Sequence, residues 1–127
     1  MAETVKDNRY TINEGGGIIQ VADDVVSSIV GIACTEVDGV SKLTGGITRD
    51  LVAKLGKNNL SNGVRVTYLD DNTIKVDTSV EVLFGYNLVE VSKAVQEKVS
   101  QSLLTMTGIT CKEVNVRISG IDFSEKN

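Results

Sequence analysis

The residues that most often carry enzyme chemistry are scarce in this chain of 127 residues. It contains no histidine, and its two cysteines, Cys34 and Cys111, are widely separated in the sequence. A serine or cysteine nucleophile would therefore lack its usual imidazole base. The cysteines match neither a C-x-x-C motif nor a zinc-ligand spacing. They could form one disulfide, although free thiols are expected in a reducing compartment. We predict no metal site, no cofactor and no catalytic cysteine.

Two pairs of adjacent acidic residues are the remaining candidates for acid–base chemistry. Asp23 and Asp24 stand at the start of a predicted helix, where carboxylates stabilise the positive end of the helix dipole. Asp70 and Asp71 fall in a predicted turn, and the DDNT stretch there lacks the glycine and the distal glutamate of a calcium-binding loop. Local backbone chemistry explains both pairs. We therefore predict no catalytic residues and no enzyme activity.

The stretch VLFGYNLVEV, residues 82–91, is the strongest candidate for a ligand site, because a glycine between two aromatic residues joins a strand pattern to a helix pattern. Backbone N–H groups at such a turn can bind an anion, and the rings can stack on a ligand. A phosphate-binding loop, however, would need more glycines or a lysine followed by serine or threonine.

The same stretch also has a complete structural interpretation. Asn87 fits the N-cap of a helix with Glu90 three residues later, as in a capping box. Tyr86 and Val91 fit the two positions of a hydrophobic staple, and Gly85 permits a backbone angle that a side chain would forbid. Phe84 is expected to continue the inward face of the strand. We predict a structural joint formed by Gly85, Tyr86, Asn87 and Glu90.

Charge is unevenly distributed along the chain. The formal net charge is −4, which disfavours a dedicated nucleic-acid-binding protein. The segment from residue 42 to residue 65 nevertheless carries five basic residues and one acid. It is either a solvated loop or a surface for an acidic partner, an anionic lipid surface or a second copy of the chain. Its basic residues are our candidate partner-binding residues: Lys42, Arg49, Lys54, Lys57 and Arg65. The polar face of the predicted sheet is the alternative contact surface.

Hydrophobic periodicity predicts two main helices. The first follows Asp23 and ends before Gly39, with an apolar stripe of Val26, Ile29, Val30, Ala33 and Val37. The second begins near Leu88 and ends at Gly108, with a stripe of Leu88, Val91, Val95, Val99, Ser102 and Met106 beside Leu103. Residues 41–63 are rich in turn residues, with a short helix expected within residues 47–55.

Alternation of apolar and polar residues predicts the strands. A short run at residues 18–21 precedes the first helix. A β-hairpin follows the turn-rich segment, with its turn at residues 70–72, and a last strand covers residues 114–119. The polar side chains expected on the face opposite the core are Arg65, Thr67, Lys75, Asp77, Ser79 and Glu81 in the hairpin, and Asn115, Arg117 and Ser119 in the last strand.

These elements predict an α+β fold: a two-layer domain with a mixed sheet of about four strands, a β-hairpin and two main helices packed on one face. We expect a single domain over residues 1–127, with a flexible arm at residues 1–13 and a tail at residues 124–127. The chain has no apolar run long enough to span a bilayer and no secretory signal, so we expect a cytoplasmic protein that does not insert into a membrane.

Several motifs resemble those of the bacterial alkaline shock protein family, also called the envelope stress response family. The family motif A-x-E-V-x-G-V occurs here with one extra residue after Ala33, so that E-V-x-G-V covers residues 36–40. The aromatic–glycine turn precedes the long helix. V-Q-E-x-V lies within that helix, M-T-G ends it, and V-N-V lies in the last strand. The resemblance extends from Gly17 to Ile121. Leu88 and Val89 stand where the family often has a proline, and residues 41–60 match least.

The resemblance implies a non-enzymatic, cytoplasmic protein of mostly Gram-positive bacteria, linked to cell-envelope homeostasis and to alkaline or envelope stress. Some members of this family lie at the membrane through a membrane-anchored partner and self-associate, whereas others are encoded beside enzymes of fatty-acid or phospholipid metabolism. No catalytic motif is implied.

Our main hypothesis is therefore a scaffold or adaptor that binds protein partners, self-associates and lies at the inner membrane face through a partner. A regulatory partner of lipid-metabolism enzymes is the alternative. A small RNA-binding module is the third possibility, although no nucleic-acid partner is expected from the acidic composition.

Overall fold

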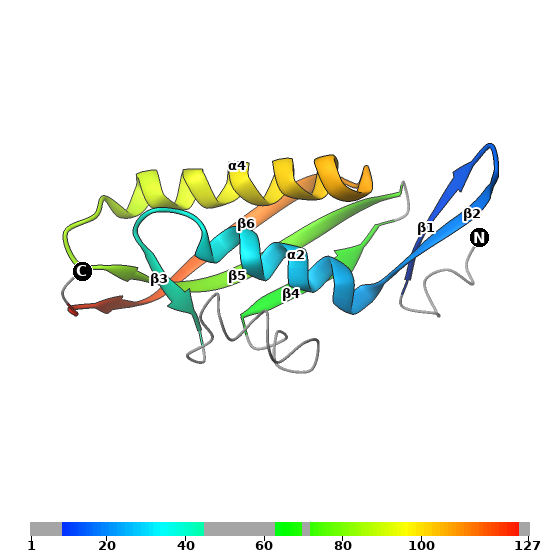
Figure 1. Cartoon of the computed structure of the whole chain (residues 1–127). Helices are drawn as coiled ribbons and strands as arrows, with labels where there is room; N and C mark the ends of the chain where they lie inside the picture. Colours follow the sequence, from blue (N-terminus) through cyan, green and yellow to red (C-terminus); the bar gives the residue numbers. More distant parts are fainter. Residues whose placement is uncertain (1–8, 45–62, 70–71, 125–127) are drawn as a thin grey trace.

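The computed structural model describes residues 9–44, 63–69 and 72–124, which form two helices and six strands (Figure 1). The elements in chain order are β1 (Arg9–Glu14), β2 (Gly17–Ala22), α2 (Asp23–Thr35), β3 (Val40–Leu43), β4 (Val64–Tyr68), β5 (Thr73–Leu83), α4 (Leu88–Thr107) and β6 (Thr110–Asp122). Helices α2 and α4 pack against each other on one face of the sheet (Figure 1). The predicted two-layer α+β fold is confirmed.

Strand β5 is the centre of the main sheet. β6 pairs with it in parallel from Thr73 to Leu83, whereas β3 and β4 both pair with it antiparallel. Because β6 follows one edge of β5 along its whole length, β3 and β4 must share the other edge. The sheet is therefore mixed, and the β5–α4–β6 unit is the predicted strand–helix–strand return.

The edge formed by β3 and β4 behaves as one interrupted strand. The Thr44 N–H donates to the Ser79 carbonyl at 2.9 Å, and the Ser79 N–H donates to the Gly63 carbonyl at 3.0 Å. Thr44 and Gly63 thus both bond to the same residue of β5, Ser79. β3 lies in the segment predicted as turns, and the short helix predicted within residues 47–55 falls outside the described residues.

The core lies between the sheet and the helices. Residues of β5 alternate between buried and half-buried along the strand, as the sequence pattern predicts. Helix α4 contributes one buried residue per turn, at an interval of four positions, as expected for a helix packed on a sheet. These core residues are Ile74, Val76, Val80 and Val82 in β5 and Val91, Val95, Val99 and Leu103 in α4. Leu88 and Met106, predicted on the same stripe, are 42% and 68% exposed, so that part of the prediction is wrong.

Helix α2 begins at the predicted acidic pair but ends earlier than predicted. Asp23 and Asp24 lie in its first turn, and Asp23 Oδ1 also accepts a hydrogen bond of 2.8 Å from the Tyr68 hydroxyl of β4. The helix ends at Thr35, so Val37 packs on the core from the following turn rather than from the helix. Gly39 is not the helix cap; it lies buried in that turn with φ of +96°.

The amino-terminal strands form a separate two-stranded sheet. β1 pairs antiparallel with β2 from Arg9↔Ala22 to Glu14↔Gly17, and this hairpin projects beyond the start of α2 (Figure 1). Residues 9–13, predicted as part of a flexible arm, are therefore in a strand. The prediction failed because strand pairing with β2 supplies the hydrogen bonds that a free arm would lack. Of the predicted tail, Ser124 is described, and residues 125–127 lie outside the described residues.

Candidate functional site

The face of the sheet opposite the helices is polar, and no described helix covers it. Side chains from β4, β5 and β6 point to it, which confirms the predicted outward face of the hairpin and of the last strand. We call this surface the open face. Its described members are Lys42, Arg65, Thr67, Lys75, Asp77, Ser79, Glu81, Glu113, Asn115, Arg117 and Ser119.

Opposite charges lie side by side on neighbouring strands of the open face. Arg65 lies opposite Asp77 in the β4–β5 register, and Asp77 lies beside Asn115 in the β5–β6 register. The Asn115 amide donates to Asp77 Oδ1 at 3.0 Å and to Glu113 Oε2 at 2.9 Å. Such cross-strand pairs stabilise the sheet by up to about 1 kcal/mol each. The arrangement therefore fixes the positions of the acidic side chains and leaves the arginine head groups available.

A shallow depression of about 350 Å³ lies in the middle of the open face. Arg65 and Arg117 are among its lining residues, and neither forms an ion pair within the described part of the chain. A guanidinium group binds a carboxylate or a phosphate with two parallel hydrogen bonds. The full lining comprises Gly63, Val64, Arg65, Asp77, Thr78, Ser79, Asn115, Val116 and Arg117. The depression can therefore accept an acidic side chain of a partner.

Two of the five predicted basic residues lie on the open face. Lys42 of β3 pairs with Glu81 at 3.8 Å, and Arg65 of β4 is exposed. The other three, Arg49, Lys54 and Lys57, fall outside the described residues. Arg117 was not among the five basic residues of the predicted segment, because it is distant from Arg65 in the sequence, but it lies on the polar sheet face predicted as the alternative contact surface. Its polar position in the alternating last strand was the available signal.

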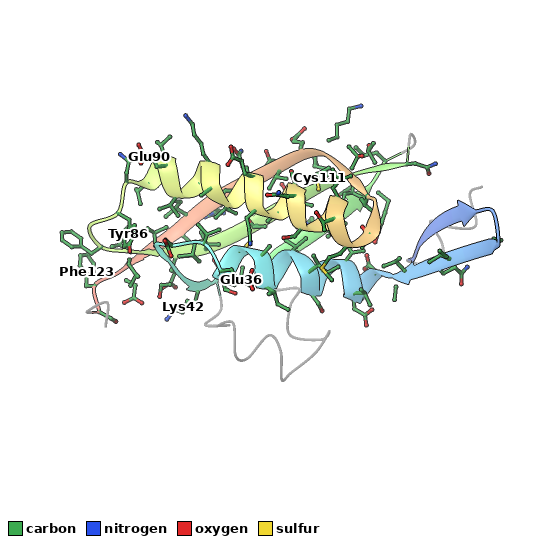
Figure 2. The ribbon with its side chains drawn as sticks, turned by 45° about the horizontal axis from the view of Figure 1, so that its top comes forward. Glu36, Lys42, Tyr86, Glu90, Cys111 and Phe123 are labelled. Carbon is green, nitrogen blue, oxygen red and sulfur yellow. The ribbon has the colours of Figure 1, made fainter. Side chains whose placement is uncertain are left out.

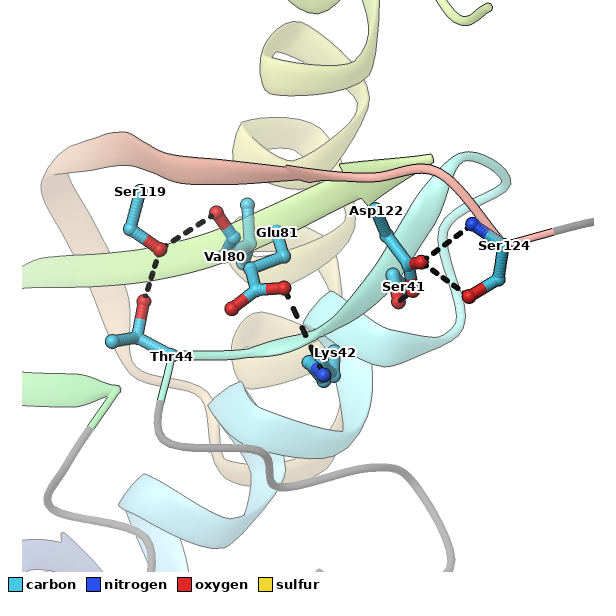
Figure 3. Close-up of polar contacts among 8 residues, drawn as sticks. All are labelled: Ser41, Lys42, Thr44, Val80, Glu81, Ser119, Asp122 and Ser124. Carbon is cyan, nitrogen blue, oxygen red and sulfur yellow. Dashed lines mark hydrogen bonds and ion pairs between the residues drawn. The ribbon is translucent and has the colours of Figure 1, made fainter. Parts of the chain in front are cut away.

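Hydrogen bonds tie β6 to β3 across one end of the open face (Figure 3). The hydroxyl groups of Thr44 and Ser119 lie 2.7 Å apart, and the Ser119 hydroxyl also donates to the Val80 carbonyl at 3.3 Å. Asp122 accepts hydrogen bonds from the Ser124 hydroxyl at 2.6 Å, from the Ser124 N–H at 2.9 Å and from the Ser41 hydroxyl. These donors, the Ser124 hydroxyl first, lower the pKa of Asp122 to about 2.

The glycine turn between β5 and α4 is the predicted joint. Gly85 has φ of +103°, and the Asn87 side chain accepts a hydrogen bond of 2.9 Å from the Glu90 N–H. Tyr86 and Val91 meet at Gly39, since a Cβ atom on Gly39 would lie 2.7 Å from the Tyr86 ring and 2.9 Å from Val91 Cγ2. The N-cap at Asn87 is therefore confirmed, and both predicted staple residues pack around Gly39.

Phe84 does not continue the inward face of β5, so that prediction is wrong. Its side chain is 70% exposed and packs against Phe123, with ring centroids 5.2 Å apart. Strand β5 ends at Leu83, and the turn that follows rotates Phe84 away from the core. Figure 2 shows Tyr86, Glu90 and Phe123 at this end of the molecule, whereas Cys111 lies towards the other end of α4.

The two cysteines are free thiols, as expected. Burial raises the pKa of the Cys34 thiol to about 12, and burial also raises the pKa of the partly buried Cys111. A thiol with a raised pKa is a poor nucleophile at neutral pH. Within residues 9–44, 63–69 and 72–124, no three potential ligands among Cys, Asp and Glu come together to hold a metal ion.

These features define a class of protein: a small two-layer α+β domain whose sheet presents a charge-patterned face that neither described helix covers. The Asp23 family, described as having a cell envelope-related function, matches residues 11–123. The chain therefore belongs to the Asp23 family, whose name is unrelated to residue 23 of this chain. The resemblance to the alkaline shock protein family is confirmed.

Relatives with similar sequences come from Gram-positive bacteria. The protein YqhY of Bacillus subtilis is 39% identical over 110 residues, covering 87% of this chain and 81% of YqhY. The protein Spy1614 of Streptococcus pyogenes is 34% identical over 118 residues, covering 91% of this chain and 97% of the relative. A stress response regulator gls24 homolog of Streptococcus pyogenes is 26% identical over 111 residues, covering 87% of this chain and 62% of that protein.

Solved structures with a similar fold include the domain called MamM CTD. One mutant form of this domain aligns with a TM-score of 0.52 at 17% identity, covering 76% of this chain and 93% of that chain. The copper form of MamM CTD aligns with a TM-score of 0.51. At this level of identity the likeness shows a shared fold and nothing of function. Among the described residues, neither helix combines the length and the apolar character needed to cross a bilayer.

Proposed function

We propose that this protein is a non-enzymatic adaptor in the cell-envelope stress response, which binds protein partners at the inner membrane face and self-associates. The cell envelope-related role of the family supports the setting. The observation that carries the proposal is the open face: a charge-patterned sheet surface with a depression between Arg65 and Arg117. In this proposal the protein lies in the cytoplasm and reaches the membrane through a membrane-anchored partner.

The side chains available on the described residues favour binding over catalysis. The chain has no histidine, and the buried Cys34 has a pKa raised to about 12, so the usual nucleophile–base pairs cannot form. The carboxylates near the depression are used within the sheet, since Asp77 and Glu113 both accept from Asn115. Arg65, Lys75 and Arg117 are the groups on this surface that remain available to an acidic partner.

The test replaces Arg65 and Lys75 with glutamine and uses Lys93→Gln as the matched control. Lys93 is exposed on α4, in the helical layer. We expect the Arg65→Gln/Lys75→Gln variant to lose about tenfold or more in affinity for its partner, because buried arginine contacts are frequent hot spots. Growth under alkaline or envelope stress should fail with this variant in place of the wild type and should be normal with Lys93→Gln.

A photo-reactive cross-linker at Thr67 provides the physical readout. Thr67 lies on the open face in β4, so a cross-linker there should capture a protein partner, and one at Lys93 should capture none. Equal capture from both positions, or full stress resistance with Arg65 and Lys75 both neutralised, would exclude the open face as the adaptor surface.

A further inference from the structure

The outer edge of β6 is the longest unpaired strand edge in the part of the chain that the structure describes. β6 has 13 residues and pairs with β5 on one side, while no described strand pairs with its other side. A strand edge of this length presents a row of backbone donors and acceptors to any second strand. By contrast, β3 and β4 are short and interrupted at the opposite edge of the sheet.

The backbone groups that point to this outer edge belong to Val114 and Val116. The Thr78 hydroxyl of β5 donates to the Asn115 carbonyl at 3.4 Å, so the backbone of Asn115 faces β5. Successive residues of a strand direct their backbone groups to opposite sides, which turns the groups of Val114 and Val116 outward. The Gln96 amide of α4 reaches the Val114 carbonyl at 3.0 Å, in agreement with this assignment.

Two irregularities limit the part of β6 that can pair regularly. The β5–β6 register shifts between Cys111 and Glu113 and again between Ile118 and Gly120. The regular run is therefore Glu113–Ile118. It has Asn115 near its middle, and the two charges of the run, Glu113 and Arg117, lie two residues to either side of Asn115 on the open face.

We propose that two copies of the chain associate by antiparallel pairing of their β6 edges, with the twofold axis at Asn115. This register places Glu113 opposite Arg117 of the second copy, twice, and Val114 opposite Val116. Each Val114–Val116 pair exchanges both of its backbone hydrogen bonds. The Val114 carbonyl has two lone pairs, so its bond to Gln96 is compatible with the pairing. The inference rests on the self-association in the proposed function and names its interface.

Charge selects this register over its neighbours. A shift of two residues in one direction leaves Arg117 opposite Asn115 and Glu113 opposite Ser119, so both opposite-charge pairs are lost. A shift of one residue turns the polar row of one copy towards the apolar row of the other. In the proposed register the two open faces join into one continuous surface, so a dimer presents two copies of the depression to a multivalent partner. In each copy Arg117 then pairs with Glu113 of the second copy, and Arg65 is the lining arginine left for the partner.

The test is a charge swap on the full chain, measured by sedimentation velocity over a range of concentrations at low salt. Glu113→Arg places two arginines opposite each other at both ends of the pairing, and Arg117→Glu places two glutamates there. We expect each single variant to weaken dimerisation by about tenfold or more, because like charges in register are strongly unfavourable. The double variant Glu113→Arg/Arg117→Glu should recover the wild-type dissociation constant.

Mixing the two single variants gives the sharpest result. One variant then carries arginines at positions 113 and 117 and the other carries glutamates, so a heterodimer should form although each variant alone is monomeric. Arg65→Glu, with the same charge change at the opposite edge of the same face, is the control and should dimerise as the wild type does. Circular dichroism melting verifies that every variant folds.

The proposal is overturned if the wild type remains monomeric at about 1 mM, or if the single variants dimerise as tightly as the wild type. It is also overturned if neither the double variant nor the mixture recovers dimerisation. The proposed adaptor function has its own test: it is overturned if the Arg65→Gln/Lys75→Gln variant keeps partner capture and stress resistance. Dimerisation that survives this double substitution, with partner capture lost, would support both proposals as independent properties of the open face and of the β6 edge.

Discussion

The two faces of β5 differ in almost every respect although their residues alternate along one strand. On the covered face, Ile74, Val76, Val80 and Val82 are 0% exposed. On the open face, Lys75, Asp77 and Glu81 are charged and half-buried at most. One strand therefore supplies both the centre of the core and the centre of the candidate binding surface. Substitutions of neighbouring residues can then separate folding from binding.

Thr78 is the exception on the covered face. It is 3% exposed, and its hydroxyl donates to the Asn115 carbonyl at 3.4 Å. A buried hydroxyl is tolerated when it has such a partner. Because Asn115 also holds Asp77 and Glu113 on the open face, the strand pair β5–β6 connects the core to the charged surface.

The largest expected effect comes from adding a methyl group on the covered side of the joint. Gly39→Ala would place Cβ 2.7 Å from the Tyr86 ring and 2.9 Å from Val91, at φ of +96°. Backbone strain and overpacking together should cost about 2–5 kcal/mol of unfolding free energy. Gly85→Ala, at φ of +103° with no atom within 4 Å of the new Cβ, carries only the backbone strain of about 1–3 kcal/mol.

Urea unfolding of both glycine variants measures the difference. Gly39→Ala should be the less stable of the two, because only this position is enclosed by Tyr86 and Val91. Equal losses of stability would mean that the staple residues move apart at little cost, and that the covered side of the joint is not tightly packed.

A second prediction compares adjacent residues on the two faces. Val80→Ala removes two methyl groups from a fully buried position and should cost about 2–3 kcal/mol of unfolding free energy. Ser79→Ala, the matched control on the open face, should change it by about 0.5 kcal/mol or less. Thermal and urea unfolding would check both values. A large loss for Ser79→Ala would show that the open face also contributes to the core energetics.

The smallest expected effect is a pH dependence at the rim of the open face. The pKa of Asp122 is lowered to about 2, so its hydrogen bonds stabilise the fold above pH of about 4 and are lost as the pH falls towards 2. Asp122→Asn should therefore be less stable than the wild type at pH 5, with the difference shrinking towards pH 2. Urea midpoints across this range provide the measurement. A constant difference would remove ionisation of Asp122 as the cause.

Local signals in the sequence were sufficient for most of the elements. The Asn87–Glu90 spacing predicted a cap that forms one hydrogen bond of 2.9 Å, and Gly108 predicted the end of α4 and adopts φ of +77° there. Alternation predicted β5 and the hairpin because each strand has one apolar and one polar face. Such interactions involve residues within a few positions of each other, so the sequence displays them directly.

The failures involve residues whose surroundings come from distant parts of the chain. Strand β3 is four residues long and lies in a turn-rich segment, so its pairing with β5 had no periodic signal. Phe84 follows the alternation of β5 in sequence, but the turn at Gly85 and the ring of Phe123 place it outside the core. Met106 is exposed because the buried residues of α4 recur every four positions, from Val91 to Leu103, and this line does not pass through position 106.

The candidate site also combines residues that local sequence indicated with one that only a long-range contact brings in. Lys42 and Arg65 were predicted from their basic segment, whereas Arg117 joins them only because β6 pairs beside β5. The alternation of β6 indicated that Arg117 faces away from the core, but the spacing along the chain could not indicate which strand would be its neighbour. The register of β5 with β6 decided this.

The sequence by itself determined the α+β class, the long helix with its cap, the polar face of the hairpin and the family. These features depend on side-chain periodicity and on backbone chemistry within one or two turns. Tertiary structure alone decided the division of one sheet edge between β3 and β4, the depression between Arg65 and Arg117 and the outer edge of β6, with which no described strand pairs. The physical reason is that strand pairing and sheet register are set by contacts between distant segments, and those contacts leave no local pattern in the chain.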